Sequence, residues 1–365
     1  MTKKDLKIVF MGTPEFAVAT LRALVENGYN VVAVVTQPDK PVGRHGSVLR
    51  APAVKEYALS VGLPVLQPEK MKDADFVEQL RSYQADLQVV VAFRMLPEIV
   101  WAMPRFGTFN VHAALLPQYR GAAPINWAII NGETETGVTT FFLDHDIDTG
   151  QIILQKRFQI PDDADVEYVY DGLMNLGAEI ALETVDLVIE NDGKISTISQ
   201  EEILFLMSDG NQQKSFSEKK FSPLCMERGR ERGFQLNPAP KLFKETCRIN
   251  WNQSANNIYN FVRGLSPVPV AWTTLVSDNF SENSPKTVEN EKNATSIDLK
   301  IYKTQKTNRP CNASAGTLLV EKSQLFVATA DEWLEILELQ LAGKKRMAAH
   351  DFLNGFKNPQ NYRVE

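Results

Sequence analysis

Short apolar runs and amphipathic stretches alternate along the first half of the chain. The run KIVFM at 7–11 ends at a Gly-Thr-Pro turn, and the spacing of apolar residues at 16–24 then predicts a helix. Further apolar runs at 31–36, 87–93 and 107–111 predict buried strands that are separated by helical stretches. β-Branched runs that alternate with amphipathic helices are typical of a parallel sheet covered on both faces. We therefore predict a doubly wound α/β amino-terminal domain with a mainly parallel sheet.

Polar loops follow three of these predicted strands. They begin at Gly12, Thr36 and Asn110, and ligands of doubly wound sheets bind in the loops that leave the carboxyl ends of the strands. The first loop contains Gly12 alone rather than a GxGxxG pattern, which argues against a nicotinamide dinucleotide as the ligand. In the same loop, Thr13 has the hydroxyl of a helix-capping residue, and Pro14 suits the first turn of the helix.

The pattern changes after a long amphipathic stretch at 167–189, which predicts the helix that closes the first domain. Clustered charges and the sequence NPAP then indicate a linker or insertion. Beyond it, runs of β-forming residues punctuated by Asn, Ser, Gly and Pro predict a smaller β-rich domain, with an OB-like barrel as one arrangement. These runs lie at 270–276, 296–302, 316–320 and 324–330. The predicted division of the chain is 1–200, 201–240 and 241–365.

Composition indicates a folded, water-soluble protein. Of the 365 residues, 44% are hydrophobic and 23% are charged, which is enough apolar material for two cores, and no apolar run reaches the length of a membrane span. The start of the chain, MTKKDLKIVF, lacks the features of a secretory signal, so a cytoplasmic location is expected. Cys225, Cys247 and Cys311 show no CxxC spacing, which argues against a disulfide framework and against structural zinc, and we predict no metal.

The net charge of −6 is distributed unevenly. Residues 241–365 include 16 basic and 13 acidic side chains and therefore carry +3, which leaves −9 for residues 1–240. Contacts to phosphate are made mainly by Lys and Arg. The mildly basic carboxyl-terminal part therefore permits contact with RNA without being evidence for it.

Reactive side chains are densest between 110 and 148. Asn110 and His112 are two residues apart, so a strand through both places their side chains on one face at the end of the sheet. An amide donor and a protonated imidazole together stabilise an oxyanion on a carbonyl oxygen, and Asp148 could orient the imidazole. An Asn and a His at a strand end can instead satisfy backbone groups in a turn, and His145 is a second histidine near Asp148. No Ser or Cys has a convincing base, so covalent catalysis has no positive support.

The stretch FNVHAALLPQYRGAAPINW, together with the later LDHDIDTG, resembles the folate-dependent formyltransferase family. It combines Asn-x-His, Leu-Leu-Pro followed by Arg-Gly, and Asp-x-x-x-Asp-Thr-Gly, a combination that few unrelated chains would carry. The resemblance implies transfer of a formyl group from 10-formyltetrahydrofolate, the co-substrate, to an amine. It also implies that Asn110 and His112 polarise the formyl group and stabilise the tetrahedral intermediate, while Asp148 pairs with His112 and assists proton removal. No metal and no covalent intermediate are implied.

The flanking segments resemble the branch of this family that formylates methionyl-tRNA. KIVFMGTPEFAVATLRAL, TQPDKPVGR, LPVLQP, GLSPVPVAW and LQLAGKKRM occur in the same order, so the resemblance spans nearly the whole chain except 201–235. It implies the initiator methionyl-tRNA as acceptor, for translation initiation, with a purine-precursor or amino-sugar nucleotide amine as the alternative. A folate- or RNA-binding protein without catalysis is a third interpretation, against which the intact Asn110, His112 and Asp148 weigh. A monomer is expected.

The resemblance also implies two sets of binding residues. The folate would contact Phe93, Arg94, Met95, Leu96, Leu115, Leu116, Pro117 and Asp144. The tRNA would contact Lys40, Arg44 and Arg50 in the loop after the second strand, and Lys344 and Lys345 in a later basic cluster. The chain departs from the family pattern at Arg94, where Gly is usual, and at Ala114, where Ser is usual. The tRNA loop is poor in Lys after Arg44, which predicts a shallower dependence of tRNA binding on salt.

Overall fold

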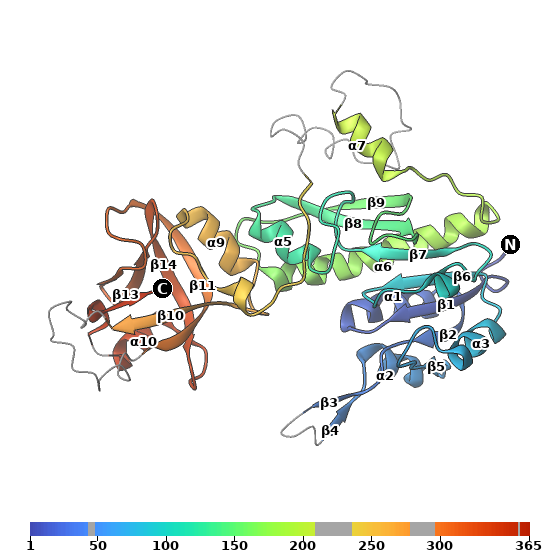
Figure 1. Cartoon of the computed structure of the whole chain (residues 1–365), viewed down its shortest axis with the longest axis horizontal. Helices are drawn as coiled ribbons and strands as arrows, with labels where there is room; N and C mark the ends of the chain where they lie inside the picture. Colours follow the sequence, from blue (N-terminus) through green and yellow to red (C-terminus); the bar gives the residue numbers. More distant parts are fainter. Residues whose placement is uncertain (43–47, 209–235, 278–295, 357) are drawn as a thin grey trace. The chain divides into compact units, whose positions relative to one another are not determined.

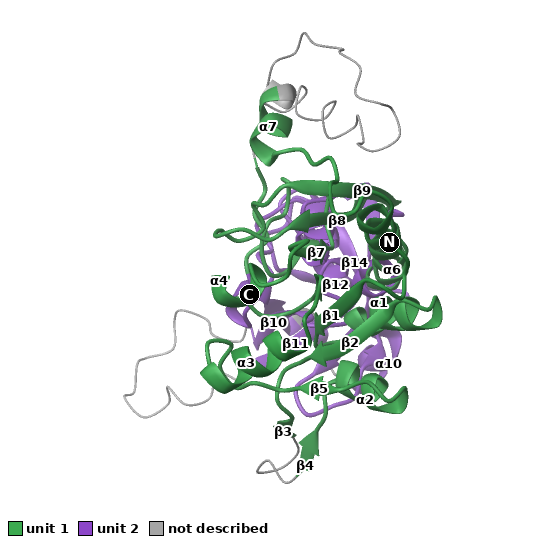
Figure 2. Cartoon of the chain, turned by 90° about the vertical axis from the view of Figure 1, so that its right-hand side faces the viewer, with its two compact units in different colours: residues 1–124, 135–159, 170–240 green, residues 125–134, 160–169, 241–365 purple. Residues whose placement is uncertain are grey.

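The structure, a computed structural model, describes residues 1–42, 48–208, 236–277, 296–356 and 358–365 (Figure 1). The chain forms two compact units, which Figure 2 distinguishes by colour. Unit 1 comprises 1–124, 135–159 and 170–240, and unit 2 comprises 125–134, 160–169 and 241–365. Unit 2 therefore includes two segments from the first half of the chain, and the division at 200 and 240 stays a prediction.

Unit 1 is built on a seven-stranded sheet with the order β5-β2-β1-β6-β7-β8-β9. The first five strands in this order are parallel, and β8 pairs antiparallel with both β7 and β9. The predicted doubly wound, mainly parallel sheet is confirmed, although the sequence patterns did not reveal β8 and β9. The strand order reverses between β1 and β6, the place at which such folds bind ligands. The bounds are β1 Lys7–Gly12, β2 Asn30–Val35, β5 Val65–Leu66, β6 Leu87–Val91, β7 Thr108–His112, β8 Glu135–Phe142 and β9 Ile152–Gln159.

Helices pack on both faces of this sheet. On one face, Phe76 of α3 and Val100 of α4 join an apolar cluster with Val9 and Val90 of the sheet. On the other face, a Cβ added to Gly177 of α6 would lie 3.4 Å from Val111 of β7. The bounds are α1 Glu15–Glu26, α2 Ala53–Ser60, α3 Ala74–Ser82, α4 Glu98–Trp101, α6 Val166–Glu190 and α7 Gln200–Ser208, with a separate hairpin of β3 Lys40–Val42 and β4 Val48–Arg50. The predicted helix at 167–189 is thus confirmed. Among the described helices, none has the length and apolar character that crossing a membrane requires.

The turn after β1 differs from the sequence prediction in one detail. Helix α1 begins at Glu15, Pro14 occupies the N-cap position, and no side chain caps the helix. Within the described residues, the buried hydroxyl of Thr13 has no hydrogen-bond partner. The prediction that Thr13 caps this helix is therefore wrong. The helix begins one residue later than the pattern suggested, so Thr13 lies outside the position from which a hydroxyl reaches the free amides of the first turn.

Unit 2 is built on an antiparallel sheet in which β12, β13, β14, β11, β10 and β16 are successive neighbours and β15 pairs with β14. The two ends of this order meet, because the N–H of Val364 donates to the carbonyl of Gly316 at 2.9 Å and Thr317 bridges to Arg363. The predicted small, barrel-like β-rich fold is confirmed. The bounds are β10 Ala271–Ser277, β11 Ile297–Pro310, β12 Leu318–Glu321, β13 Gln324–Ala328, β14 Glu332–Leu341, β15 Met347–Ala348 and β16 Tyr362–Val364.

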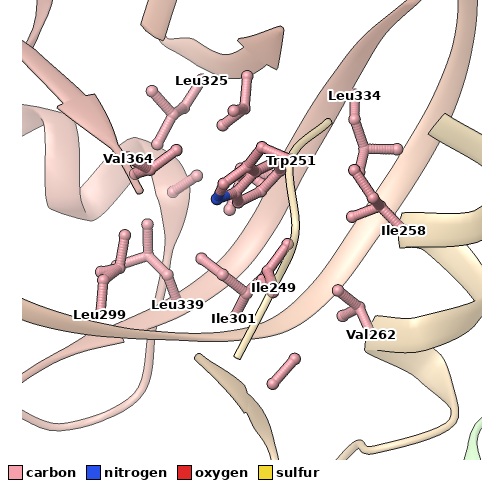
Figure 3. Packing of buried hydrophobic residues seen from close by; sticks show 14 of the residues in the cluster. Ile249, Trp251, Ile258, Val262, Leu299, Ile301, Leu325, Leu334, Leu339 and Val364 are labelled. Carbon is pink, nitrogen blue, oxygen red and sulfur yellow. The ribbon is translucent and has the colours of Figure 1, made fainter. Parts of the chain in front are cut away.

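The core of unit 2 lies inside this curved sheet (Figure 3). Ile258 and Val262 of α9 pack there with Trp251, whose indole N–H donates to the hydroxyl of Thr273 at 2.9 Å. Ile130 of α5, which comes from the first half of the chain, packs against the same cluster. The helices of this unit are α5 Pro124–Ile130, α9 Ala255–Arg263 and α10 Ala349–Gly355, with short 3₁₀ helices η2 Glu245–Cys247 and η3 Pro359–Asn361.

Closure of the unit 2 sheet depends on a glycine. Gly316 has φ +87°, and a Cβ at this position would overlap the carbonyl oxygen of Val364. We expect Gly316→Ala to lower the free energy of unfolding by about 3 kcal/mol, because backbone strain and overpacking add. Gly343→Ala is the matched control, since Gly343 has φ +75° but open space around the added Cβ, and it should cost only about 1 kcal/mol. Denaturant titration of the two variants measures the difference, and equal losses would contradict the steric argument.

Candidate active site

Asn110 and His112 lie on β7, next to the strand at which the order of the sheet reverses. Strand β7 pairs with β6 on one side and with β8 on the other, where His112 is opposite Thr139. Because Val111 faces α6, the alternation of side chains along a strand turns Asn110 and His112 to the opposite face. Asn110 is half-buried, and His112 exposes only 6% of its surface. The two side chains therefore share one face at the carboxyl end of the strand.

The imidazole of His112 has a partner at each nitrogen. Its Nε2 lies 2.9 Å from the carbonyl oxygen of Tyr119, and its Nδ1 lies 3.8 Å from Oδ2 of Asp148. A carbonyl oxygen only accepts hydrogen bonds, so Nε2 carries a proton and Nδ1 is the nitrogen at which protonation can change. The 3.8 Å separation is longer than a hydrogen bond, so Asp148 acts on the imidazole through its charge.

The position of Asp148 is set by its loop. Asp148 has φ +56°, in the left-handed region, and its Oδ2 accepts the backbone N–H of Gly121 at 2.9 Å. Earlier in the loop, Oδ1 of Asp144 accepts the N–H of Asp146 and the hydroxyl of Thr149 at 3.2 and 2.7 Å. The carboxylate that faces His112 is thus held by a backbone amide from another loop.

A buried glutamine joins these two loops. The Nε2 of Gln200, the first residue of α7, donates to the carbonyls of Asp148 and Gly150, each at 2.9 Å. Its Oε1 accepts from Nε and Nη2 of Arg120 at 3.0 and 2.6 Å. Gln200 is completely buried. The donors and the acceptor of this one amide are therefore all used within the site.

The end of the predicted linker supports the loop that carries Gly121. The N–H of Tyr119 donates to the carbonyl of Asn237 at 2.7 Å, and the N–H of Ala239 donates to the carbonyl of Arg120 at 2.8 Å. Gly121 has φ +128°, and a Cβ there would overlap the carbonyl oxygen of Ala239. A segment more than a hundred residues away in the chain thus packs directly on the loop whose Tyr119 carbonyl contacts His112.

The predicted folate residues after β6 have different environments. Leu96 is buried in the apolar cluster with α3 and α4, Phe93 packs beside that cluster, and Met95 is 72% exposed. The guanidinium of Arg94 donates to the carbonyls of Pro68 and Glu69, and burial lowers its pKa. The charged group that replaces the usual Gly is therefore bound to the loop after β5, and Met95 is the most exposed apolar side chain of this segment.

The predicted folate residues after β7 and β8 also differ in their burial. Leu116 is completely buried in a cluster with Phe141 and Ile198, Pro117 is buried, and Leu115 is half-buried. Asp144 is exposed. The side chain of Leu116 thus contributes to the core, so a ligand at this segment would contact its backbone and its neighbours.

The second histidine of this region, His145, lies away from the first. Its ring contacts Trp101 edge-on at 5.4 Å between centroids, and its Nδ1 is 4.0 Å from Glu98. Its side chain is 73% exposed. The geometry therefore favours His112 over His145 as the partner of Asp148. In the described part of the chain, no group of three or more His, Cys, Asp or Glu side chains is arranged to hold a metal ion.

The predicted tRNA residues fall in separate places. Lys40 and Arg50 are exposed and lie opposite each other on the paired strands β3 and β4. Arg44 lies outside the described residues. Lys344 and Lys345 are exposed in the turn between β14 and β15, which belongs to unit 2. The hairpin residues belong to unit 1.

Three residues of the site received no role from sequence reasoning. Arg120 and Gly121 lie inside the Arg-Gly segment that carried the family resemblance, so their place in the motif was a usable signal. The sequence gives no such signal for Gln200, because a single glutamine in the acidic stretch SQEE belongs to no motif. Its contacts reach back 80 residues to Arg120 and 52 residues to Asp148.

Comparison with known proteins places the chain among formyltransferases. A family described as "Formyl transferase" matches residues 6–185, and one described as "Formyl transferase, C-terminal domain" matches residues 241–357. The methionyl-tRNA formyltransferase of Parabacteroides distasonis is 55% identical over 365 residues, and that of Phocaeicola vulgatus is 53% identical over 367 residues. Both matches cover 100% of each chain.

Solved structures share the fold at lower identity. WlaRD, a sugar 3N-formyl transferase solved in the presence of dTDP and 5-N-formyl-THF, has a TM-score of 0.54 at 19% identity, covering 93% of this chain and 99% of its own. HypX from Aquifex aeolicus in complex with tetrahydrofolic acid has a TM-score of 0.55 at 15% identity, covering 96% of this chain and 47% of its own. At these identities the likeness concerns the fold alone.

Proposed function

The chain belongs to the formyl transferase family, and from this premise we propose that it transfers the formyl group of 10-formyltetrahydrofolate to the α-amine of initiator methionyl-tRNA. The acceptor is inferred from relatives named methionyl-tRNA formyltransferase, which match the whole chain at 53–55% identity. The observation that carries the site is the Asp148 carboxylate 3.8 Å from a buried His112 that shares a strand face with Asn110. The product is formylmethionyl-tRNA, which serves translation initiation.

The reaction is direct attack of the neutral amine on the formyl carbon. As the nitrogen–carbon bond forms, negative charge develops on the formyl oxygen, and the amine must lose a proton while the folate nitrogen that leaves takes one up. The Asn110 amide supplies a fixed donor for the oxygen, and the protonated imidazole of His112 supplies positive charge. His112 acts where water is largely excluded, since it is buried.

The role of Asp148 is to stabilise the protonated form of His112. Its carboxylate stabilises the imidazolium through space at 3.8 Å, while the Tyr119 carbonyl keeps the proton on Nε2. Nδ1 is then the nitrogen that exchanges a proton during the reaction. This division of labour needs no covalent intermediate, and positioning of the two substrates supplies the rest of the rate.

The two substrates would approach the site from loops at the carboxyl ends of the strands. We assign the folate to the segments at 93–96 and 115–117 and to Asp144, where the exposed side chain of Met95 offers apolar surface to a ring. We assign phosphate or base contacts of the tRNA to the exposed Lys40, Arg44 and Arg50, and to Lys344 and Lys345. The enzyme would act in the cytoplasm as a monomer.

The alternative acceptor is a purine-precursor or amino-sugar nucleotide amine, since the fold is shared with a sugar formyltransferase. Full-length protein should be incubated with 10-formyltetrahydrofolate and, in parallel, charged initiator tRNA, glycinamide ribonucleotide and a dTDP-amino sugar. We expect formylation of the methionyl-tRNA only, and a nucleotide-linked product alone would contradict the proposal. Deleting 241–365 is a poorer test, because Ile130 packs on the core of that part and would lose its partners.

A further inference from the structure

We infer that Gln200 is a positioning residue of the catalytic site, which holds Asp148 at His112 by joining the two loops on which Asp148 depends. The inference rests on the proposed function, because it concerns the rate of formyl transfer. Gln200 lies between the segments 6–185 and 241–357 that the family descriptions match.

The first loop held by Gln200 carries Asp148 itself. The side-chain amide donates both of its hydrogens, one to the carbonyl of Asp148 and one to the carbonyl of Gly150. These bonds constrain the backbone on both sides of Thr149, at the point where Asp148 adopts φ +56°. A left-handed non-glycine residue persists only where its surroundings hold it. The bonds from Gln200 are part of that support.

The second loop held by Gln200 carries the amide that binds the Asp148 carboxylate. Arg120 donates two hydrogen bonds to Oε1 of Gln200, and the next residue, Gly121, donates its backbone N–H to Oδ2 of Asp148. Gln200 therefore sets the distance between the donor and the acceptor of that bond. If the two loops separate, the carboxylate loses its anchor and moves relative to His112.

Gln200 is itself held firmly. Two residues earlier, the backbone of Ile198 exchanges hydrogen bonds with Ile152 at 2.9 and 3.0 Å. The side chains of Ile198 and Ile203 are buried in the cluster with Leu116. The segment is thus anchored to β9 and to the core, and its buried amide is a rigid bridge. Only an amide supplies two donors and a strong acceptor here, since a carboxylate lacks the donors, and a thioether lacks the donors and accepts only weakly.

The test compares Gln200→Glu and Gln200→Met with the wild-type full-length chain. Gln200→Glu keeps an acceptor for Arg120 but turns negative oxygens towards the two carbonyls, and Gln200→Met keeps length and burial but no hydrogen bond. For each, kcat and the KM of both substrates are measured, with rates expressed per folate-binding site and the melting temperature recorded. We expect kcat to fall about 10- to 100-fold in both variants, as for other residues that orient a catalytic group, with each KM changed less than about threefold.

Thr197→Ala is the matched control. Thr197 lies on the same segment and is half-buried, and its hydroxyl donates to the side chain of Gln151, so its removal leaves the bonds of Gln200 to Asp148, Gly150 and Arg120 in place. This variant should keep the wild-type kcat. A kcat within about threefold of wild type in both Gln200 variants would overturn the inference. A loss of folate-binding sites without a loss of kcat per site, or a variant with no binding sites at all, would also overturn it, because the role would then be structural.

The wild-type rate in the same assay separates the inference from its premise. A wild-type chain that forms no formylmethionyl-tRNA contradicts the proposed function, and the inference falls with it. An active wild-type chain with equally active Gln200 variants contradicts only the role of Gln200.

Discussion

Asn110→Ala should turn over about 10²–10³ times more slowly than the wild-type chain. The Asn110 amide is the fixed donor proposed for the formyl oxygen, and its contribution is greatest when negative charge has developed on that oxygen. Removing it should therefore lower kcat with little change in the KM of either substrate. Steady-state rates of formylmethionyl-tRNA formation, with each substrate varied in turn, measure both quantities.

The control for this variant is Asn30→Ala. Asn30 is the first residue of β2, whereas the site lies at the carboxyl ends of the strands. Its side chain donates to the carbonyl of Lys4 at 2.9 Å. Replacement there removes an amide of the same kind from the same sheet and should leave kcat unchanged. Unchanged turnover in Asn110→Ala would rule out the oxyanion role of Asn110.

Asp148→Asn should lower kcat by about 10²–10³, within the range that general acid–base groups contribute. The asparagine keeps an oxygen that can accept the N–H of Gly121, so the loop geometry is preserved while the negative charge 3.8 Å from Nδ1 of His112 is lost. The imidazolium then loses the charge that stabilises it. Single-turnover rates with preformed enzyme and both substrates measure the chemical step directly.

Asp146→Asn is the matched control for this second variant. Asp146 is exposed in the same loop, two residues from Asp148, and its backbone N–H rather than its carboxylate takes part in the hydrogen bonds of the loop. It makes the same change of charge at nearly the same place. Equal losses in the two variants would show that the charge of the loop as a whole, and not Asp148 in particular, serves the reaction.

The parallel strands of unit 1 were predictable because their signal is local. β1, β2 and β6 are mainly apolar runs buried on both faces, and such runs stand out against the amphipathic helices between them. β8 and β9 were missed. Their sequences, ETGVTTFF and IILQKRFQ, mix polar and apolar residues without a clear period, and β9 is only half-buried along most of its length. The pairing of β8 with β7, and of β9 with β8, is what makes them strands.

The candidate site also has residues that the sequence could place and residues that it could not. Asn110 and His112 could be placed together from sequence because they are neighbours on one strand, and the family resemblance added Asp148. The environment of the predicted folate residues could not be read from the sequence. The side chain of Leu116 points into the core, and that of Arg94 points towards Pro68 and Glu69. The direction of a side chain depends on what packs around it.

By itself, the sequence determined the fold class, the strand that bears Asn110 and His112, and the family to which the chain belongs, because hydrophobic periodicity and short motifs are properties of neighbouring residues. Only the tertiary structure decided which polar atoms meet. The backbone amide of Gly121 holds the Asp148 carboxylate beside His112, and Gln200 joins the two loops, over separations of 27 to 80 residues along the chain. Hydrogen bonds over such distances form once the core has brought the loops together, so no local pattern predicts them.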